Sequence, residues 1–184
     1  MYSGKFFLSV SLTILIRVKL SFLSSPPPSS SYVPIHVTKC LIYDPWLDPL
    51  ATPGPLTPSQ DMSILVINSQ QFTLWTEHFT QVMQMVEKHG GSLITLVKST
   101  HMQFSDFLLL PLIPGKQGAS TVMDRIEQLS IAFLNEHPFD VRRAIEQQGL
   151  TPRKMVVTTI PGKKDKYGEP KRDLEGRIGD IILH

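Results

Sequence analysis

The chain has 184 residues, 41% of them hydrophobic, so we expect one domain with tails and exclude wholesale disorder. Eighteen Lys and Arg against sixteen Asp and Glu leave a net charge of +2, too small to indicate a nucleic-acid binder. The single cysteine, Cys40, excludes a disulfide framework and a multi-thiolate zinc site, and no run reaches the roughly 18 apolar residues of a spanning helix.

The N-terminal segment, residues 1–31, differs in character from the rest of the chain. Lys5 precedes an apolar run over residues 6–16, which has the length of the hydrophobic region of a signal peptide. Arg17 follows that run where a small-residue cleavage site would be expected. Two interpretations therefore stay open, a secretory signal or anchor and an unrelated N-terminus produced by the gene model. We expect nothing folded here, and the localisation stays open between cytoplasmic and secreted.

Three short apolar segments predict strands, at residues 39–43, 63–68 and 92–97. They are apolar without alternation, as expected for strands that are covered on both faces of a sheet. A Pro-rich loop, residues 44–61, separates the first strand from the second. A helix is predicted over residues 73–89, ended by two glycines, with an apolar stripe at a 3.6-residue period. This stripe consists of Trp75, Phe79, Val82, Met83 and Val86.

A second helix is predicted over residues 120–136, with Ser120 or Thr121 as its N-cap. The order strand, strand, helix, strand, helix predicts an α/β fold with a partial parallel sheet of about three strands and flanking helices. We place this partial domain at residues 32–137. Residues 138–184 are polar and rich in Pro and Gly, so we expect a surface tail with one candidate strand at 155–160.

Two residues with catalytic chemistry follow predicted strands. Asp44 comes after the first strand and His101 after the third, and in doubly wound α/β proteins active sites lie at the carboxyl ends of the strands. A carboxylate that orients an imidazole base is two thirds of a Ser-His-Asp triad, and the order acid before base agrees with α/β-hydrolases. The alternative is structural, since Asp before Pro commonly starts a turn and a lone His is often just a polar loop residue.

Three segments resemble the motifs of one family. YDPWLDPL (43–50) resembles the acid loop of the platelet-activating factor acetylhydrolases, the plasma and intracellular type II serine phospholipases. SILVINSQQF (63–72) resembles their strand P-L-x-x-I-N-S-E-x-F, and THMQFSDF (100–107) resembles their histidine loop. The motifs occur in the family's order, and the likeness covers about residues 38–137.

The resemblance implies an α/β-hydrolase that cleaves short sn-2 acyl groups from phospholipids such as platelet-activating factor, without metal or cofactor. It implies that Asp44 is the triad acid and His101 the general base. Residues that shape the histidine loop would be Phe104, Asp106 and Phe107. The phospholipid substrate is the partner that the resemblance implies, with binding at a lipid interface left open and no nucleic acid. Gln70 departs from the family, which often has Glu there, and we interpret that position as structural.

The nucleophile is missing from the expected place. The family's G-x-S-x-G elbow lies before the acid, but Gly4 is the only glycine before Gly54, and counting back leads to Ser21. Ser92 begins a predicted strand and Ser120 follows the histidine, so neither fits. We therefore expect the C-terminal part of a hydrolase without its nucleophile. The alternative is a truncated, inactive remnant or pseudoenzyme that acts as a binding module.

The remaining motifs are weak. The six histidines show no metal-ligand spacing, and we expect His78 and His89 to lie mostly on the helix surface. PGKQGAST (114–121) fails the phosphate-loop pattern. For Trp46 and Leu47 we favour core packing over contact with lipid. Because the missing strands would leave a sheet edge open, we expect the isolated chain to be poorly soluble or oligomeric.

Overall fold

A five-stranded sheet forms the centre of the protein. The computed structural model describes residues 14–19, 36–46, 62–104, 118–165 and 167–184, with the backbone alone for 14–19, 36 and 37. The sheet has the order β1-β2-β3-β4-β7. Its strands are β1 (Ile14–Lys19), β2 (His36–Tyr43), β3 (Ser63–Ser69), β4 (Ser92–Leu96) and β7 (Ile181–Leu183).

The three central strands, β2, β3 and β4, are parallel, whereas β1 and β7 pair antiparallel with their neighbours. The prediction of an α/β fold with a parallel sheet of three strands and flanking helices is thus confirmed. The outer strands β1 and β7 were not predicted, and they extend the parallel sheet by one strand on each side.

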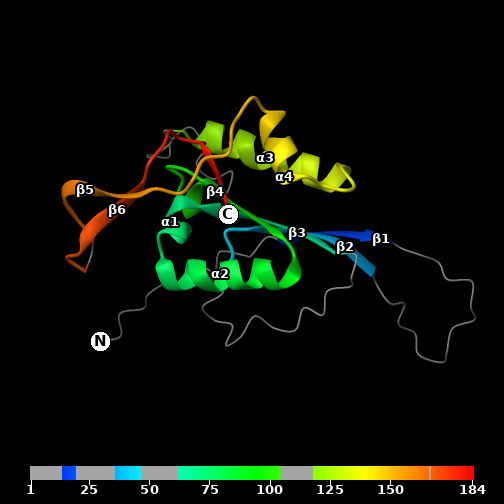
Figure 1. Ribbon diagram of the computed structural model, residues 1–184, viewed down its shortest axis with the longest axis horizontal. Helices are drawn as coiled ribbons and strands as arrows, with labels where there is room; N and C mark the ends of the chain where they lie inside the picture. Colours follow the sequence, from blue (N-terminus) through cyan, green and yellow to red (C-terminus); the bar gives the residue numbers. More distant parts are fainter. Residues whose placement is uncertain (1–13, 20–35, 47–61, 105–117, 166) are drawn as a thin grey trace, which may run out of the picture.

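Helices cover both faces of the sheet (Figure 1). On one face lies α2 (Thr76–His89), preceded by the single turn α1 (Gln70–Thr73), and on the other lie α3 (Ala119–Asn135) and α4 (Val141–Glu146). A 3₁₀ turn, η1 (His101–Phe104), follows β4. Among the described residues, no helix combines the length and the apolar character needed to cross a membrane.

Alternation along the strands produces two cores. On β3, for example, Ile64 and Val66 pack with the α2 side, whereas Leu65 and Ile67 pack with α3 and α4. This is why the strands are apolar without alternation: successive side chains point to opposite faces, and both faces are covered.

The helix predicted over residues 73–89 is two helices, because Leu74 and Trp75 interrupt it. The predicted stop is confirmed, since Gly90 caps α2 in the left-handed conformation. The predicted stripe is partly wrong. Val82 and Val86 are buried, but Trp75 is 39% exposed. His78, which we expected on the surface, is buried beside them.

The expectation that nothing folds within residues 1–31 is wrong. Strand β1 lies in this segment and pairs with β2 from Ile14, opposite Ile42, to Lys19, opposite His36. The edge of β2 that we expected to be open is therefore occupied by β1.

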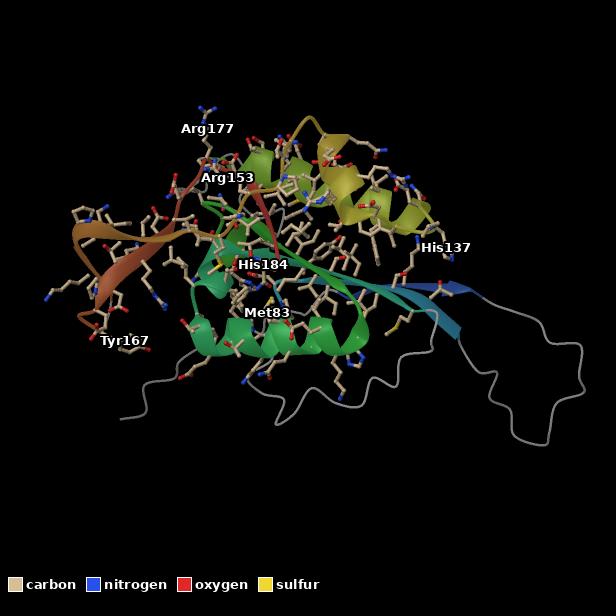
Figure 2. All side chains as sticks on the ribbon, viewed as in Figure 1. Met83, His137, Arg153, Tyr167, Arg177 and His184 are labelled. Atoms are coloured by element: carbon tan, nitrogen blue, oxygen red, sulfur yellow. The ribbon has the colours of Figure 1, made fainter. Side chains whose placement is uncertain are left out.

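The C-terminal segment 138–184 is not a surface tail, and the domain does not end at residue 137. It contains α4, and β7 places the buried residues Ile181 and Ile182 in the main sheet. Between them, β5 (Val157–Lys164) and β6 (Pro170–Leu174) form a hairpin that projects from the body, with the exposed Tyr167 near its tip (Figures 1 and 2). The candidate strand at 155–160 corresponds to the first part of β5.

Helix α3 matches its predicted range within one residue, but the predicted caps are wrong. Gly118, in the left-handed conformation, is the N-cap, and no side chain caps the helix. At the other end of α3, the buried Lys39 of β2 donates hydrogen bonds to the carbonyl oxygens of Phe133, at 2.6 Å, and Leu134, at 3.2 Å. A cation at a helix C-terminus is favourable, and here it ties the helix to the sheet.

Candidate active site

Asp44 and His101 meet at the carboxyl edge of the parallel strands. Asp44 follows β2 directly, and His101 begins η1, five residues after the last residue of β4. The imidazole Nδ1 lies 2.7 Å from Asp44 Oδ2. The carboxylate is almost completely buried, with 1% of the side chain exposed, whereas 24% of the imidazole is exposed. The contact expected from strand topology is therefore present, and part of the imidazole is open to solvent.

The backbone of Asp44 is unusual. Its φ of 43° lies in the left-handed region, which Asp tolerates better than most residues. Its N–H donates to the carbonyl of Ile67 on β3 at 2.9 Å. The turn aims the carboxylate along the sheet edge, toward β3 and the loop after β4.

Ser69, the last residue of β3, holds the carboxylate with two donors. Its backbone N–H donates to Asp44 Oδ1 at 2.7 Å, and its hydroxyl donates to Oδ2 at 2.8 Å. Ser69 is fully buried. Both carboxylate oxygens are therefore hydrogen-bonded, which offsets the cost of burying the charge.

Aromatic rings extend from His101 across α1 to the start of α2. The ring of Phe72 lies 4.8 Å from the His101 ring and 4.9 Å from the His78 ring, between centroids. His78 in turn stacks on Trp75 at 5.1 Å. The backbone N–H of His101 donates to Gln71 Oε1 at 3.1 Å. The imidazole is thus positioned from its ring face and from its backbone.

His78 also fixes the loop that carries the acid. Its Nε2 lies 2.5 Å from the carbonyl oxygen of Pro45, the residue after Asp44. Pro45 is buried, but Trp46 is 47% exposed, so the expected core packing of Trp46 is wrong. The acid turn is therefore connected to β3 on one side and to α2 on the other.

Gln70 connects the site to the projecting hairpin. Its Oε1 accepts the backbone N–H of Lys98 at 2.8 Å, and its Nε2 donates to Asp173 Oδ1 on β6 at 2.8 Å. Lys98 pairs with Asp173 as well. Burial of Asp173 favours its neutral form, but the hydrogen bonds from Lys98 and Gln70 outweigh it, and the pKa of that carboxyl is lowered.

No described serine is placed as a nucleophile. Ser92 begins β4, at the edge opposite Asp44, and Ser120 is exposed on α3. At the carboxyl edge, Ser69 is bonded to Asp44, and Ser99 donates to the Leu96 carbonyl at 2.6 Å while it accepts the Gln70 N–H. Strand β1 runs against β2, so its end at Lys19 lies beside the start of β2, at the opposite edge.

Some predicted residues lie outside the described part of the chain, namely Leu47, Asp106, Phe107 and Ser21. Phe104 is described and packs, partly buried, against the core on the α3 side. Within the described ranges, no group of three or more His, Cys, Asp and Glu side chains could hold a metal ion.

Sequence reasoning missed Ser69 and His78. The signal for His78 was available, because His78, Val82, Met85 and Val86 follow one helical stripe and all four are buried. The signal for Ser69 was its place at the end of the strand that neighbours Asp44. His78 was expected on the helix surface, and Ser69 lies just beyond the predicted strand, residues 63–68.

The comparisons with known proteins show a family match. Residues 16–150 match the model of the family described as platelet-activating factor acetylhydrolase, isoform II. No curated protein and no solved structure matches the chain. The matched range begins within β1 and ends after α4, so it contains Asp44, Ser69, His78 and His101, whereas the hairpin and β7 lie beyond it.

Proposed function

The chain belongs to the platelet-activating factor acetylhydrolase isoform II family, and we propose that it carries the acid and the base of a serine esterase. The substrate would be a phospholipid with a short sn-2 acyl group, such as platelet-activating factor. The observation that carries the proposal is the 2.7 Å contact between His101 Nδ1 and the buried Asp44 carboxylate at the edge of the parallel strands.

The geometry supports specific roles. A carboxylate can only accept a hydrogen bond, so His101 donates from Nδ1, and in the neutral ring Nε2 is left with the free lone pair. In the proposed reaction, Nε2 takes the proton of a serine hydroxyl as that oxygen attacks the ester carbonyl. It then gives the proton to the departing lysophospholipid alkoxide. Water repeats the sequence on the acyl-serine, and acetate leaves. Asp44 stays ionised and stabilises the imidazolium that forms in each step.

The serine of this reaction is not supplied by a G-x-S-x-G motif of these 184 residues, because the sequence has none. We therefore expect the chain alone to show no hydrolysis of platelet-activating factor above background and no labelling by a fluorophosphonate, which requires an activated serine. The oxyanion donor that follows the nucleophile would be absent too, and one such donor is typically worth about 10²–10³ in rate. Stoichiometric labelling that disappears in His101→Ala would contradict this part of the proposal.

The base can be tested separately with p-nitrophenyl acetate, an activated ester that does not need the serine. We expect slow hydrolysis, part of which is lost in His101→Ala and kept in His137→Gln, a variant of an exposed histidine. Equal rates for all three proteins would remove the support for His101 as a base.

A second candidate, a catalytically inactive binding module of the same family, is favoured by the missing elbow. The gene sequence upstream of codon 32 separates the two candidates. An in-frame G-x-S-x-G roughly 23 residues before Asp44 supports the esterase. In the longer product, Asp44→Asn should then lower the rate about 10⁴-fold, as for other triad acids replaced by an amide. Absence of the motif supports the binding module.

A further inference from the structure

We propose that the Ser69 hydroxyl is a positioning group that holds the Asp44 carboxylate in the orientation His101 requires. The inference rests on the proposed function for its catalytic meaning, but its geometry stands alone. Ser69 Oγ lies 2.8 Å from the same oxygen, Asp44 Oδ2, that lies 2.7 Å from His101 Nδ1.

The direction of the Ser69 bond is fixed by its two partners. The hydroxyl has one proton, and its oxygen also lies 3.2 Å from the backbone N–H of Phe72. That N–H can only donate, so Oγ accepts there, and the proton is left for the carboxylate. A hydroxyl that only capped α1 would act as an acceptor alone. Here the same group is required as acceptor by the helix and as donor by the acid.

The two donors of Ser69 form a clamp on the carboxylate. Its N–H bonds Oδ1 at 2.7 Å while its hydroxyl bonds Oδ2, so rotation about the Cβ–Cγ bond of Asp44 breaks at least one bond. One remaining lone pair of Oδ2 then faces His101. Without the hydroxyl, only Oδ1 is held by Ser69, and Oδ2 is free to turn away from the imidazole.

Ser69 is well suited to this task because its own position is rigid. It is fully buried at the end of β3, where it pairs with Leu96 of β4. Asp44, by contrast, has a left-handed backbone that neighbouring groups must stabilise. A rigid residue thus orients one whose own backbone is strained.

The test is the state of the His101 ring in this chain, read from its ¹⁵N chemical shifts and from the exchange of its Nδ1 proton with water. In the wild type we expect one tautomer, with the proton on Nδ1, and slow exchange. Ser69→Val should give a mixture of tautomers and faster exchange. Ser69→Thr, whose side chain has nearly the shape of valine but keeps the hydroxyl, should preserve the wild-type signals. Ser69→Ala provides a smaller variant if valine prevents folding.

A matched control separates positioning from stability. Thr73→Val removes a buried hydroxyl that contacts the Ser69 carbonyl and Thr95 but not Asp44. It should lower the melting temperature and leave the His101 signals unchanged. The proposal is overturned if Ser69→Val keeps the wild-type signals, or if Thr73→Val changes them equally. If the wild type itself lacks the protonated Nδ1 bonded to Asp44, it is the proposed function that fails.

Discussion

At the scale of single residues, the site depends on polar groups that are buried with their partners. Asp44, Ser69 and His78 are all at most 2% exposed, and each has a hydrogen-bonded contact to another part of the site. Burial without a partner would cost each group a few kcal/mol, about 1–3 for a neutral one. These residues therefore constrain one another, and the loss of one partner should be felt by the others.

His184 gives a residue-scale prediction of pH dependence. Burial lowers the pKa of His184 to about 4, and its Nε2 lies 2.8 Å from Thr95 Oγ1. In the unfolded chain its pKa returns to about 6.5, so the unfolded state binds the proton first as the pH falls. The stability that this group contributes should therefore be present above pH 6.5 and be lost as the pH falls toward 4, with a loss of about 2 kcal/mol by pH 5.

Denaturant unfolding at pH 7.5 and pH 5 measures this effect. His184→Gln should be less stable at pH 7.5 and should lose less stability on acidification than the wild type does. The exposed His137→Gln should behave like the wild type. A pH dependence that is identical in wild type and His184→Gln would show that another group is responsible.

At the scale of elements, the structure depends on contacts between segments that are distant in sequence. Gln70, next to β3, contacts both the loop after β4 and the hairpin strand β6. Its amide donates to Asp173, which a carboxylate at this position could not do. The glutamine that departs from the family's usual glutamate is thus matched to an aspartate that lies beyond the matched range.

Gln70→Glu is therefore expected to destabilise the protein by about 1–3 kcal/mol, because two carboxylates would face each other beside a single lysine, Lys98. Asp173→Asn should rescue it, since the asparagine amide can donate to the new carboxylate. A double-mutant cycle of unfolding free energies measures the coupling. Additive effects of the two substitutions would contradict the expected contact.

Gly118, at the start of α3, should tolerate substitution less well than Gly149, which follows α4. Its φ is 75°, and an added Cβ would overlap the Ile178 side chain. Gly149 has a similar φ of 71° but open space around it. Gly149→Ala should lower the free energy of unfolding by about 1–2 kcal/mol, the strain of a left-handed backbone with a Cβ. Gly118→Ala should cost about 1–3 kcal/mol more from overpacking, as measured by thermal unfolding. Equal losses of stability in the two variants would contradict the expected overlap with the Ile178 side chain.

The elements differ in how far the sequence could predict them. Strands β2, β3 and β4 and helices α2 and α3 have strong local patterns, and these also bring Asp44 and His101 together, because parallel strands end at one edge. Ile181 and Ile182 form too short an apolar run to predict a strand, and their place depends on the free edge of β4. The burial of His78 likewise depends on the Pro45 carbonyl, a partner 33 residues away. Such pairings are decided by the folded structure and not by local propensity.

At the scale of the whole molecule, the sheet ends at two antiparallel strands with different surroundings. Strand β7 carries the buried residues Ile181 and Ile182. It is joined to the loop between α4 and β5, because the backbone N–H of Arg153 donates to the Ile181 carbonyl at 2.8 Å. In the part of the chain that the structure describes, strand β1 pairs with β2 on one side and has no partner strand on the other. An unpaired strand edge is a template for pairing with another chain.

We accordingly expect the isolated chain to self-associate through the β1 edge. Size-exclusion chromatography with light scattering, over a range of micromolar concentrations, should show species larger than 20.7 kDa whose mass rises with concentration. Deletion of residues 14–19 would uncover the edge of β2 and should worsen the association. A sharp monomeric peak with cooperative unfolding would contradict the expectation.

The stacked rings beside the site have an optical consequence. Trp75 lies on the His78 ring, which contacts Phe72, which in turn contacts His101. Indole emission is sensitive to the polarity and charge of the groups that touch the ring. A rearrangement of the acid turn that moved His78 would therefore alter the fluorescence of Trp75. This indole is a built-in spectroscopic reporter that the rings of His78 and Phe72 connect to the His101 imidazole.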